Sequence, residues 1–361
     1  MKSKKGLNEK FISFLDQIDD SHKNDKLNLN DKVLIIDGLN TFIRSFSVNP
    51  AINEDGVHIG GIAGFLKSIR YTLSVIKPTR CIIVFDGKDG SKRRRKIYPE
   101  YKAQRKIKKR LNRNVDWGTA PANEEESMKL QLGRLVEYLE YLPLTIVSVD
   151  GIEADDTMAY VSKQFLSESK IVLMSTDKDF LQLVDDRVQV WSPTKKKFYG
   201  KETIKEEFEI ESKNFLMYRV LTGDSSDNIP GIRGAGTKTL QKRLPILFED
   251  KELSIDDLFK YISSSDDKTK LMQNISNNRD MLELNHKLMQ LKDVDISGRA
   301  KESIQNICVA PIQKLLKPKF MKMLLEDTIN MNIKNPQLWL KDTFNVLNSF
   351  AINKEDSNEG Q

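Results

Sequence analysis

Nine carboxylates stand in short polar stretches that follow apolar runs or open helical ones. They occupy the segments "VFDG", "GIEADD", "STDKDF" and "GDSSDNIPG" and the end of "KVLIID": Asp37, Asp86, Glu153, Asp155, Asp156, Asp177, Asp179, Asp224 and Asp227. One acidic turn of this kind usually caps a helix or lies in a solvated loop. Nine carboxylates brought to one place would instead raise each other's pKa unless cations neutralised them.

The chemistry of such a cluster favours hard divalent cations. All-oxygen ligands, without histidine or cysteine, suit Mg²⁺ or Mn²⁺. The chain has three histidines and two widely separated cysteines, Cys81 and Cys308, which argues against a thiolate zinc site and against a disulfide. Two hard ions ~4 Å apart can hold the attacking and leaving oxygens of a phosphodiester. The residues therefore predict two Mg²⁺ or Mn²⁺ ions and phosphoryl chemistry.

Strands and helices must alternate to bring these carboxylates together. The β-branched runs "KVLIID", "CIIVFD", "TIVSVD" and "KIVLMSTD" are typical of strands buried on both faces. Helical patterns lie between them, over residues 61–77, 124–142 and 153–168. The alternation predicts an α/β fold with a doubly wound, mainly parallel sheet. Ligands bind beyond the carboxyl ends of such strands, where Asp37, Asp86 and Asp177 stand.

Composition divides the 361 residues into four parts. We expect a polar N-terminal extension (1–30), an α/β core (31–200), a smaller helical region (201–350) and a disordered tail (351–361). The core should end in the hairpin "VQVWSPTKKKFYG". With 39% hydrophobic residues and no apolar run of ~20 residues, we expect a cytoplasmic protein without membrane contact.

A strongly basic segment lies inside the predicted core. From Lys92 to Arg113, twelve of 22 residues are Lys or Arg, and only Glu100 is acidic. Solvated helix faces usually mix their signs, so the run indicates contact with nucleic acid or another polyanion. A solubilising tract is the alternative. The candidate contacts are Arg93, Arg94, Arg95, Lys106, Lys108, Lys109 and Arg110.

The motifs together carry a family resemblance. "VFDG", "YKAQR", "EADD", "STDKDFLQLV" and "GDSSDNIPGIRGAGTKT" occur in the order found in the 5′-nuclease superfamily, which includes flap endonucleases, phage 5′→3′ exonucleases and the nuclease domain of bacterial DNA polymerase I. The resemblance spans about residues 32–245. "VDWG", "GIEADDTMAYVSKQF" and "WSPTKKKF" further resemble the ribonucleases H of T-even phages, which are members of this superfamily.

The resemblance implies a role for each acidic residue. A first metal ion would be held by Asp37, Asp86, Glu153 and Asp155. A second would be held by Asp177, Asp179, Asp224 and Asp227, with Asp177 close to both ions. Asp156 is a further candidate ligand, although the T-even phage enzymes carry a neutral residue at that position.

The resemblance also assigns the basic motif. Lys102 and Arg105 of "YKAQR" would reach the scissile phosphate, whereas contact with the DNA backbone is the alternative for Lys102. Tyr101 would either stack on a terminal base or pack in the interior. The surrounding segment, about residues 88–120, would form a basic helical arch over the site.

The glycines of "GIRGAGTKT" resemble a helix-hairpin-helix element. In such elements backbone groups meet a phosphate directly or through a monovalent cation. The residues concerned are Gly231, Gly234 and Gly236, with Lys238 beside them. The helical region would therefore bind duplex DNA.

These expectations describe a metal-dependent 5′ nuclease. It would hydrolyse phosphodiesters near the 5′ end of nicked, flapped or primer-bearing DNA and RNA–DNA duplexes, as in primer removal during replication. A PIN-type endoribonuclease is one alternative, although such enzymes are usually shorter and lack "YKAQR" and the glycine turn. A non-catalytic branched-DNA-binding protein is another, but unpaired buried acids are costly without a metal.

Protein partners follow only from the resemblance. Related phage enzymes act with a single-stranded-DNA-binding protein and a sliding clamp. "KFISFLDQI" and the helical C-terminal region are candidate docking sites, with core packing as the alternative for both. We expect a monomer, located in the host cytoplasm if a phage encodes it.

Overall fold

A six-stranded sheet forms the centre of the computed structural model, which describes residues 28–106, 111–117, 122–329 and 335–352. Its strands are β1 (Lys32–Asp37), β2 (Arg80–Val84), β3 (Thr145–Val147), β4 (Lys170–Met174), β5 (Val188–Ser192) and β6 (Lys197–Tyr199). Their order is β3-β2-β1-β4-β5-β6, and only β6 is antiparallel to its neighbour. The predicted α/β fold, its mainly parallel sheet and the terminal hairpin are confirmed.

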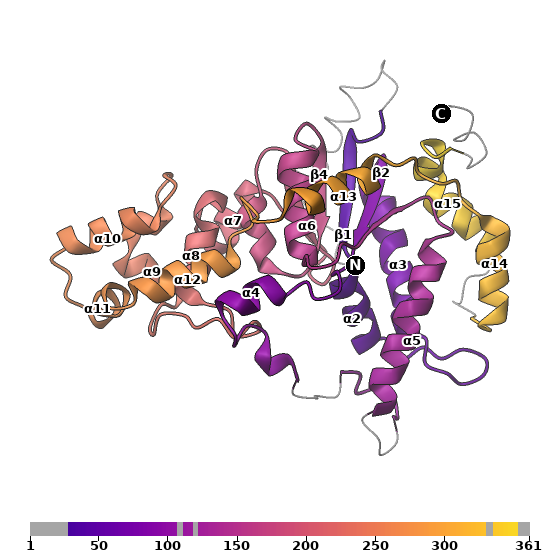
Figure 1. Cartoon of the computed structure of the whole chain (residues 1–361), viewed down its shortest axis with the longest axis horizontal. Helices are drawn as coiled ribbons and strands as arrows, with labels where there is room; N and C mark the ends of the chain where they lie inside the picture. The colour runs from indigo at the N-terminus through magenta and orange to yellow at the C-terminus, as the bar shows by residue number, and fades with distance from the viewer. Residues whose placement is uncertain (1–27, 107–110, 118–121, 330–334, 353–361) are drawn as a thin grey trace, which may run out of the picture.

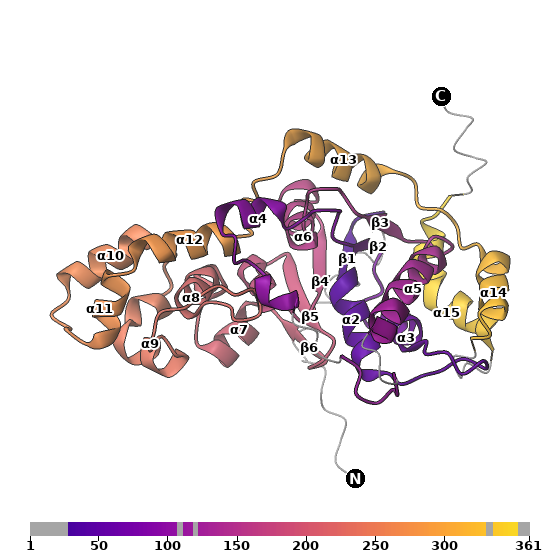
Figure 2. The same cartoon turned by 60° about the horizontal axis from the view of Figure 1, so that its bottom comes forward.

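Both faces of this sheet are buried, because successive strand residues point to opposite sides. Leu34 and Ile36 of β1 pack with α2 (Gly38–Val48), α3 (Gly60–Ile76) and α5 (Ala122–Leu139). Val33 and Ile35 pack on the other face with α6 (Ala154–Tyr160). Figure 2 shows these helices on the two sides of the strands. Each fully buried Val, Leu or Ile contributes about 1.5–3 kcal/mol to folding.

The helices of the predicted region 201–350 pack in two different places. After α7 (Lys201–Phe208), one helical unit with its own apolar core contains α8 (Phe215–Thr222), α9 (Thr237–Arg243), α10 (Ile255–Ser264), α11 (Lys270–Ser276) and α12 (Arg279–Met289). The chain then returns to the sheet as α13 (Gly298–Val309), α14 (Lys317–Glu326) and α15 (Pro336–Ser349) (Figure 1). It returns because Phe320, Trp339 and Phe344 bury their rings in the α3 layer.

The basic segment contains a short helix, α4 (Lys92–Ile97), and a 3₁₀ turn, η1 (Ala103–Lys106). The next residues, 107–110, lie outside the described ranges, as do 1–27, 118–121, 330–334 and 353–361. The predictions for "KFISFLDQI", for the contacts of Lys108, Lys109 and Arg110, and for the tail beyond residue 352 therefore fall outside the described residues, as do the side chains of Arg105 and Lys106. No described helix is long and apolar enough to cross a membrane.

Candidate active site

The carboxyl ends of three adjacent strands carry the acidic residues of the core. Asp37 ends β1, Asp86 follows β2 and Asp177 follows β4, and β1 lies between the other two strands. Ser175 connects two of these acids, because its hydroxyl donates to Asp37 Oδ2 at 3.0 Å and accepts the N–H of Asp177 at 3.1 Å. The sheet topology thus brings acids that are distant in sequence to one edge.

Asp86 joins this edge to the acidic start of α6. Its Oδ1 accepts the backbone N–H of Ala154 at 2.7 Å. The first turn of α6 carries Asp155 and Asp156, and Glu153 is its N-cap residue. Acids at a helix N-terminus are favoured by the helix dipole, so the local fold supports the placement of these residues.

Several cationic side chains reach into the acidic groups, among them Arg93, which donates to Asp156 at 3.0 Å. Lys102 pairs with Glu153 Oε1. Arg94 pairs with Glu153 as well, and holds both oxygens of Asp156 at 2.7 and 3.0 Å. Arg219, on α8, donates to Asp179 at 2.6 Å and to Asp224 at 2.5 Å. Each predicted metal group is therefore partly neutralised by side chains of the chain itself.

The remaining charge is large enough to perturb the acids strongly. Burial, with neighbouring acids adding to it, raises the pKa of Asp37 and of Asp179 to about 7. Burial also raises the pKa of Asp155 and of Asp177. For Glu153 burial acts in the same direction, but Arg94 and Lys102 overcome it and lower the pKa. The acids thus form one interacting electrostatic cluster.

The donor set fits divalent cations. Its ligands are carboxylate oxygens only, and a cation placed among them would offset the repulsion that raises their pKa values. Within the described residues no three of these side chains already stand close enough to enclose an ion.

The basic motif and the second acidic turn are joined directly. The backbone N–H of Lys102 donates to the carbonyl of Asp227 at 2.9 Å. Asn228 strengthens the junction, accepting from Gln104 at 2.9 Å and donating to the carbonyl of Glu100 at 3.0 Å. Lys102 is held at φ +57°, a left-handed conformation that costs a non-glycine residue ~1–2 kcal/mol. Surrounding contacts thus fix a lysine that touches both predicted metal groups.

The glycine turn follows the second acidic turn at close range. Asp224 and Ile229 close a short antiparallel bridge, and a Cβ at Gly231 would lie 2.1 Å from the carbonyl oxygen of Thr222. Gly234 adopts φ +90°, a conformation that glycine adopts freely. A Cβ at Gly234 or Gly236 would meet no neighbouring atom, so the backbone there borders open space.

A pocket of about 550 Å³ opens beside this turn. Its lining includes Arg233, Gly234, Arg243 and Lys270. Lys238 lies exposed on α9, the helix that the turn enters. The three cations that line the pocket make this surface suitable for binding a phosphate backbone.

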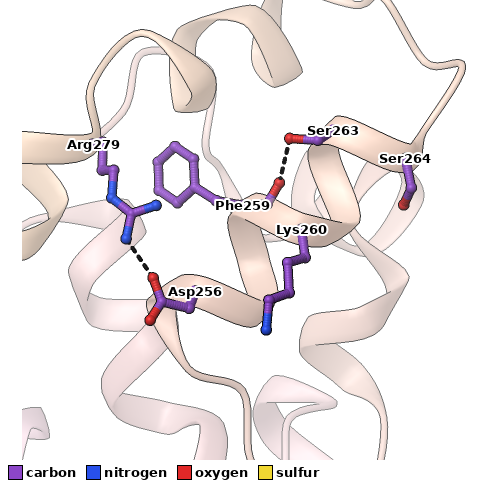
Figure 3. Close-up of a pocket in the computed structure, with 6 residues that line it drawn as sticks. All are labelled: Asp256, Phe259, Lys260, Ser263, Ser264 and Arg279. Carbon is purple, nitrogen blue, oxygen red and sulfur yellow. Dashed lines mark hydrogen bonds and ion pairs between the residues drawn. The ribbon is translucent and has the colours of Figure 1, made fainter.

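A second hollow, at α10 and α12, is unrelated to the acidic cluster (Figure 3). There the Arg279 guanidinium pairs with Asp256 and Glu283 and lies 4.8 Å from the ring centroid of Phe259. Its cation is already balanced, and Figure 1 places α10 at the end of the molecule away from the sheet.

Comparison with known proteins identifies the family. Residues 32–209 match the 5′-3′ exonuclease N-terminal resolvase-like domain, and residues 210–309 match the 5′-3′ exonuclease C-terminal SAM fold. The chain belongs to the 5′-3′ exonuclease family. The predicted membership of the 5′-nuclease superfamily is confirmed, and with it the predicted class of function, a 5′ nuclease that acts on DNA.

Individual proteins that resemble this exonuclease-family chain are consistent with this family membership. The 5′-3′ exonuclease of Aquifex aeolicus is 33% identical over 207 residues, covering 57% of this chain and 66% of the relative. That of Bacillus subtilis is 29% identical over 314 residues, covering 84% and 92%. The D15 flap endonuclease of bacteriophage T5, solved with DNA and metal ions, shares the fold with a TM-score of 0.59 at 23% identity, covering 82% and 98%.

The structure bears on the predictions for three residues of this exonuclease-family chain. Arg94 is 2% exposed and bound to carboxylates, so its position does not fit the predicted phosphate contact. Tyr101 is also buried, in the core of the helical unit, which favours packing, the second of its two predicted roles. Asp156 is held by Arg93 and Arg94, as Glu153 is by Arg94 and Lys102, and it remains a further candidate ligand.

Two residues of this family member were missed by sequence reasoning, Arg219 and Asn228. Arg219 lies in the last turn of α8, which ends at Gly223 just before the acidic turn. That spacing was the available signal, because a basic residue one turn before a helix end lies close to the loop that follows. Asn228 gave no signal, since its partners are 100 or more positions away.

Proposed function

We propose that the chain is a divalent-metal-dependent 5′ nuclease that hydrolyses phosphodiesters near the 5′ end of nicked, flapped or primer-bearing duplexes. The main support is the position of Lys102. Its side chain pairs with Glu153 of the first acidic group, and its backbone N–H donates to the carbonyl of Asp227 in the second. A basic side chain fixed between two acidic groups is suited to meet a phosphate bound there. The exonuclease family of the chain supports the same reaction.

The metal ligands in this proposal are the acids at the sheet edge and in the glycine-closed turn. Asp37, Asp86, Glu153 and Asp155 would hold one Mg²⁺ or Mn²⁺ ion, and Asp177, Asp179, Asp224 and Asp227 the second. Such ions, when bound, supply an activated water and neutralise the charge that develops on the phosphate. Solved T5 relatives of similar fold contain metal ions, which is consistent with this assignment.

Lys102 has the properties of a phosphate-binding group. Burial lowers its pKa, but Asp155 and Glu153 outweigh burial and raise it, so the ammonium stays protonated at neutral pH. Its backbone is fixed by Asp227, so the ammonium needs only to exchange Glu153 for a phosphate oxygen. A preorganised cation of this kind stabilises charge as it develops. Arg105, from the same motif, is proposed to assist it.

Duplex binding is assigned to the surface around the glycine turn and to the basic segment. Gly231, Gly234 and Gly236 would meet a phosphate through backbone groups, directly or through a monovalent cation. Lys238 and the cations of the neighbouring pocket add favourable charge. On α4, Arg95 is exposed and Arg93 is half-buried, and both are proposed backbone contacts.

The family and the sequence likenesses support a proposal for the biological task. We assign RNA-primer and flap removal in replication, with ribonuclease H activity on RNA–DNA duplexes, because several segments resemble the T-even phage ribonucleases H. A phage origin, action in the host cytoplasm as a monomer, and cooperation with a single-stranded-DNA-binding protein and a sliding clamp belong to the same proposal.

A 5′-labelled flap duplex tested beside single-stranded RNA, in Mg²⁺ or in EDTA, decides between this function and its rivals. The proposal predicts metal-dependent release of short 5′ products from the flap duplex. Cleavage of the RNA alone would indicate a PIN-type endoribonuclease. Tight flap binding without cleavage in Mg²⁺ or Mn²⁺ would indicate a non-catalytic branched-DNA-binding protein.

A further inference from the structure

Arg219 connects one acid of the sheet core to one acid of the helical unit. Its Nε donates to Asp179 Oδ1 at 2.6 Å, and its Nη2 donates to Asp224 Oδ2 at 2.5 Å. Asp179 lies in the 3₁₀ turn η3 (Lys178–Leu183) after β4, whereas Asp224 follows α8. The two acids belong to the segments that match different family domains, so this arginine joins carboxylates across the domain boundary.

The guanidinium is fixed on all sides. Its third nitrogen, Nη1, donates to the carbonyl of Gly223 at 3.3 Å, at the end of its own helix. The side chains of Arg219, Asp179 and Asp224 are 13%, 18% and 15% exposed. A planar fork that engages two carboxylates and a carbonyl sets their separation more rigidly than a lysine ammonium could.

The guanidinium of Arg219 is surrounded by acidic side chains. Asp177 lies in the same turn as Asp179, and its Oδ1 accepts the backbone N–H of that residue at 2.8 Å. Several acids thus compete for a small space, and like charges there repel. With its three nitrogens engaged, Arg219 is a fixed counter-charge that offsets this repulsion while it spans the two domains.

We propose that Arg219 is a positioning residue that preforms the second metal site by holding Asp179 and Asp224 in place before the ion binds. The inference rests on the proposed function, because it takes these two acids as metal ligands. An ordinary structural ion pair would contribute to stability alone. A positioning residue must in addition set the affinity of one metal site and leave the other unchanged.

Binding of Mn²⁺, followed by electron paramagnetic resonance without substrate, tests the proposal independently of activity. For the full chain we expect two Mn²⁺ sites. Arg219→Gln should weaken the second site by at least about tenfold, the usual effect of removing a group that orients a ligand, and leave the first site unchanged. Arg219→Lys, which keeps the charge without the fork, should fall between the two. It also serves as the folded variant if Arg219→Gln does not fold.

Arg80→Gln is the matched control. Arg80 is buried even more fully than Arg219, is bonded to Asn30 and to the carbonyl of Ala310, and lies at the amino end of β2, opposite the acidic edge. Its loss should lower the melting temperature and leave both Mn²⁺ affinities unchanged. Unchanged or tighter second-site binding in Arg219→Gln or Arg219→Lys would overturn the inference. A wild-type chain that binds no Mn²⁺ would overturn the proposed function itself.

Discussion

Arg94 and Asp156 form a two-bond ion pair in the interior, with Nη2–Oδ1 and Nη1–Oδ2 distances of 2.7 and 3.0 Å. The same guanidinium donates from Nε to the carbonyl of Leu288 at 2.8 Å, in the last turn of α12. One side chain therefore joins the basic segment, the helix that carries the predicted metal ligands, and the helical unit. A residue from the most basic stretch of the sequence is an internal connector.

Removing Arg94 should destabilise the protein. Arg94→Met leaves Asp156 buried without this partner, and breaking a buried pair on one side costs about 3–5 kcal/mol. Urea unfolding would measure the loss. Arg95→Met, a change at the exposed neighbour, should stay near wild type. The double variant Arg94→Met/Asp156→Leu should recover part of the loss, because it removes the buried charge. Equal stability of Arg94→Met and Arg95→Met would contradict the role of Arg94 as an internal connector.

Arg95 should instead contribute to DNA affinity. It is exposed on α4, and each phosphate that a protein neutralises on duplex DNA adds about −0.9 to the slope of log K against log salt concentration. Arg95→Ala should therefore make this slope less steep by about one unit when flap binding is titrated with KCl. Lys322→Ala is a suitable comparison, because α14 lies at the edge of the molecule, away from α4 (Figure 1). An unchanged slope for Arg95→Ala would favour the solubilising-tract alternative.

The difference between Arg94 and Arg95 marks the limit of what the sequence could predict. Strand runs such as "KVLIID" were recognisable because β-branched residues buried on both faces leave a continuous apolar pattern, and this placed Asp37 and Asp177 at one edge. In a run of basic residues the pattern predicts the same solvent-exposed position for every side chain. Which one turns inward depends on partners such as Leu288, nearly 200 positions away.

The packing of the helical region in two different places could not be predicted for a similar reason. Helices α14 and α15 have amphipathic patterns that predict helices but do not specify which apolar surface covers them. The α3 layer of the sheet covers Trp339 and Phe344, a contact between segments that are about 270 positions apart. The motif series of the superfamily ends at about residue 245, so no motif placed these helices against the core.

Asp37 should make the stability of the metal-free protein depend on pH. Its pKa is raised from 3.8 to about 7 by burial, so between these values the folded state holds a proton that the unfolded state releases. The free energy of unfolding should therefore fall as pH rises from about 4 to 7. Asp37→Asn keeps the helix cap and should make this fall shallower in EDTA, as measured by urea unfolding at pH 5 and pH 8. Parallel pH profiles would contradict the assignment.

Asp86 and Asp155 should be required for cleavage but not for binding. Asp86→Asn or Asp155→Asn removes a proposed ligand of the first metal ion while leaving the glycine turn and the basic segment intact. We expect cleavage of a labelled flap to be lost and its dissociation constant to stay within a few fold. In EDTA, Asp155→Asn should raise the melting temperature, because it removes a carboxylate from a crowded acidic cluster. Near-normal turnover of either variant in Mg²⁺ would remove that residue from the metal group.

Lys102 should act on the chemical step. A group that meets the scissile phosphate as charge develops lowers kcat when removed, whereas a group that only adds affinity raises KM. Lys102→Ala should therefore lose about 10²–10³-fold in single-turnover rate with enzyme well above Kd, the typical loss for one preorganised donor. Lys96→Ala, at an exposed position on α4, should lose affinity alone. Because Lys102 also pairs with Glu153, the variant should be assayed over a range of Mg²⁺ concentrations, so that a weakened metal site is distinguished from a missing phosphate contact. A rate deficit that persists at saturating Mg²⁺ supports direct contact, and equal single-turnover rates for the two lysine variants would leave Lys102 as an ordinary backbone contact.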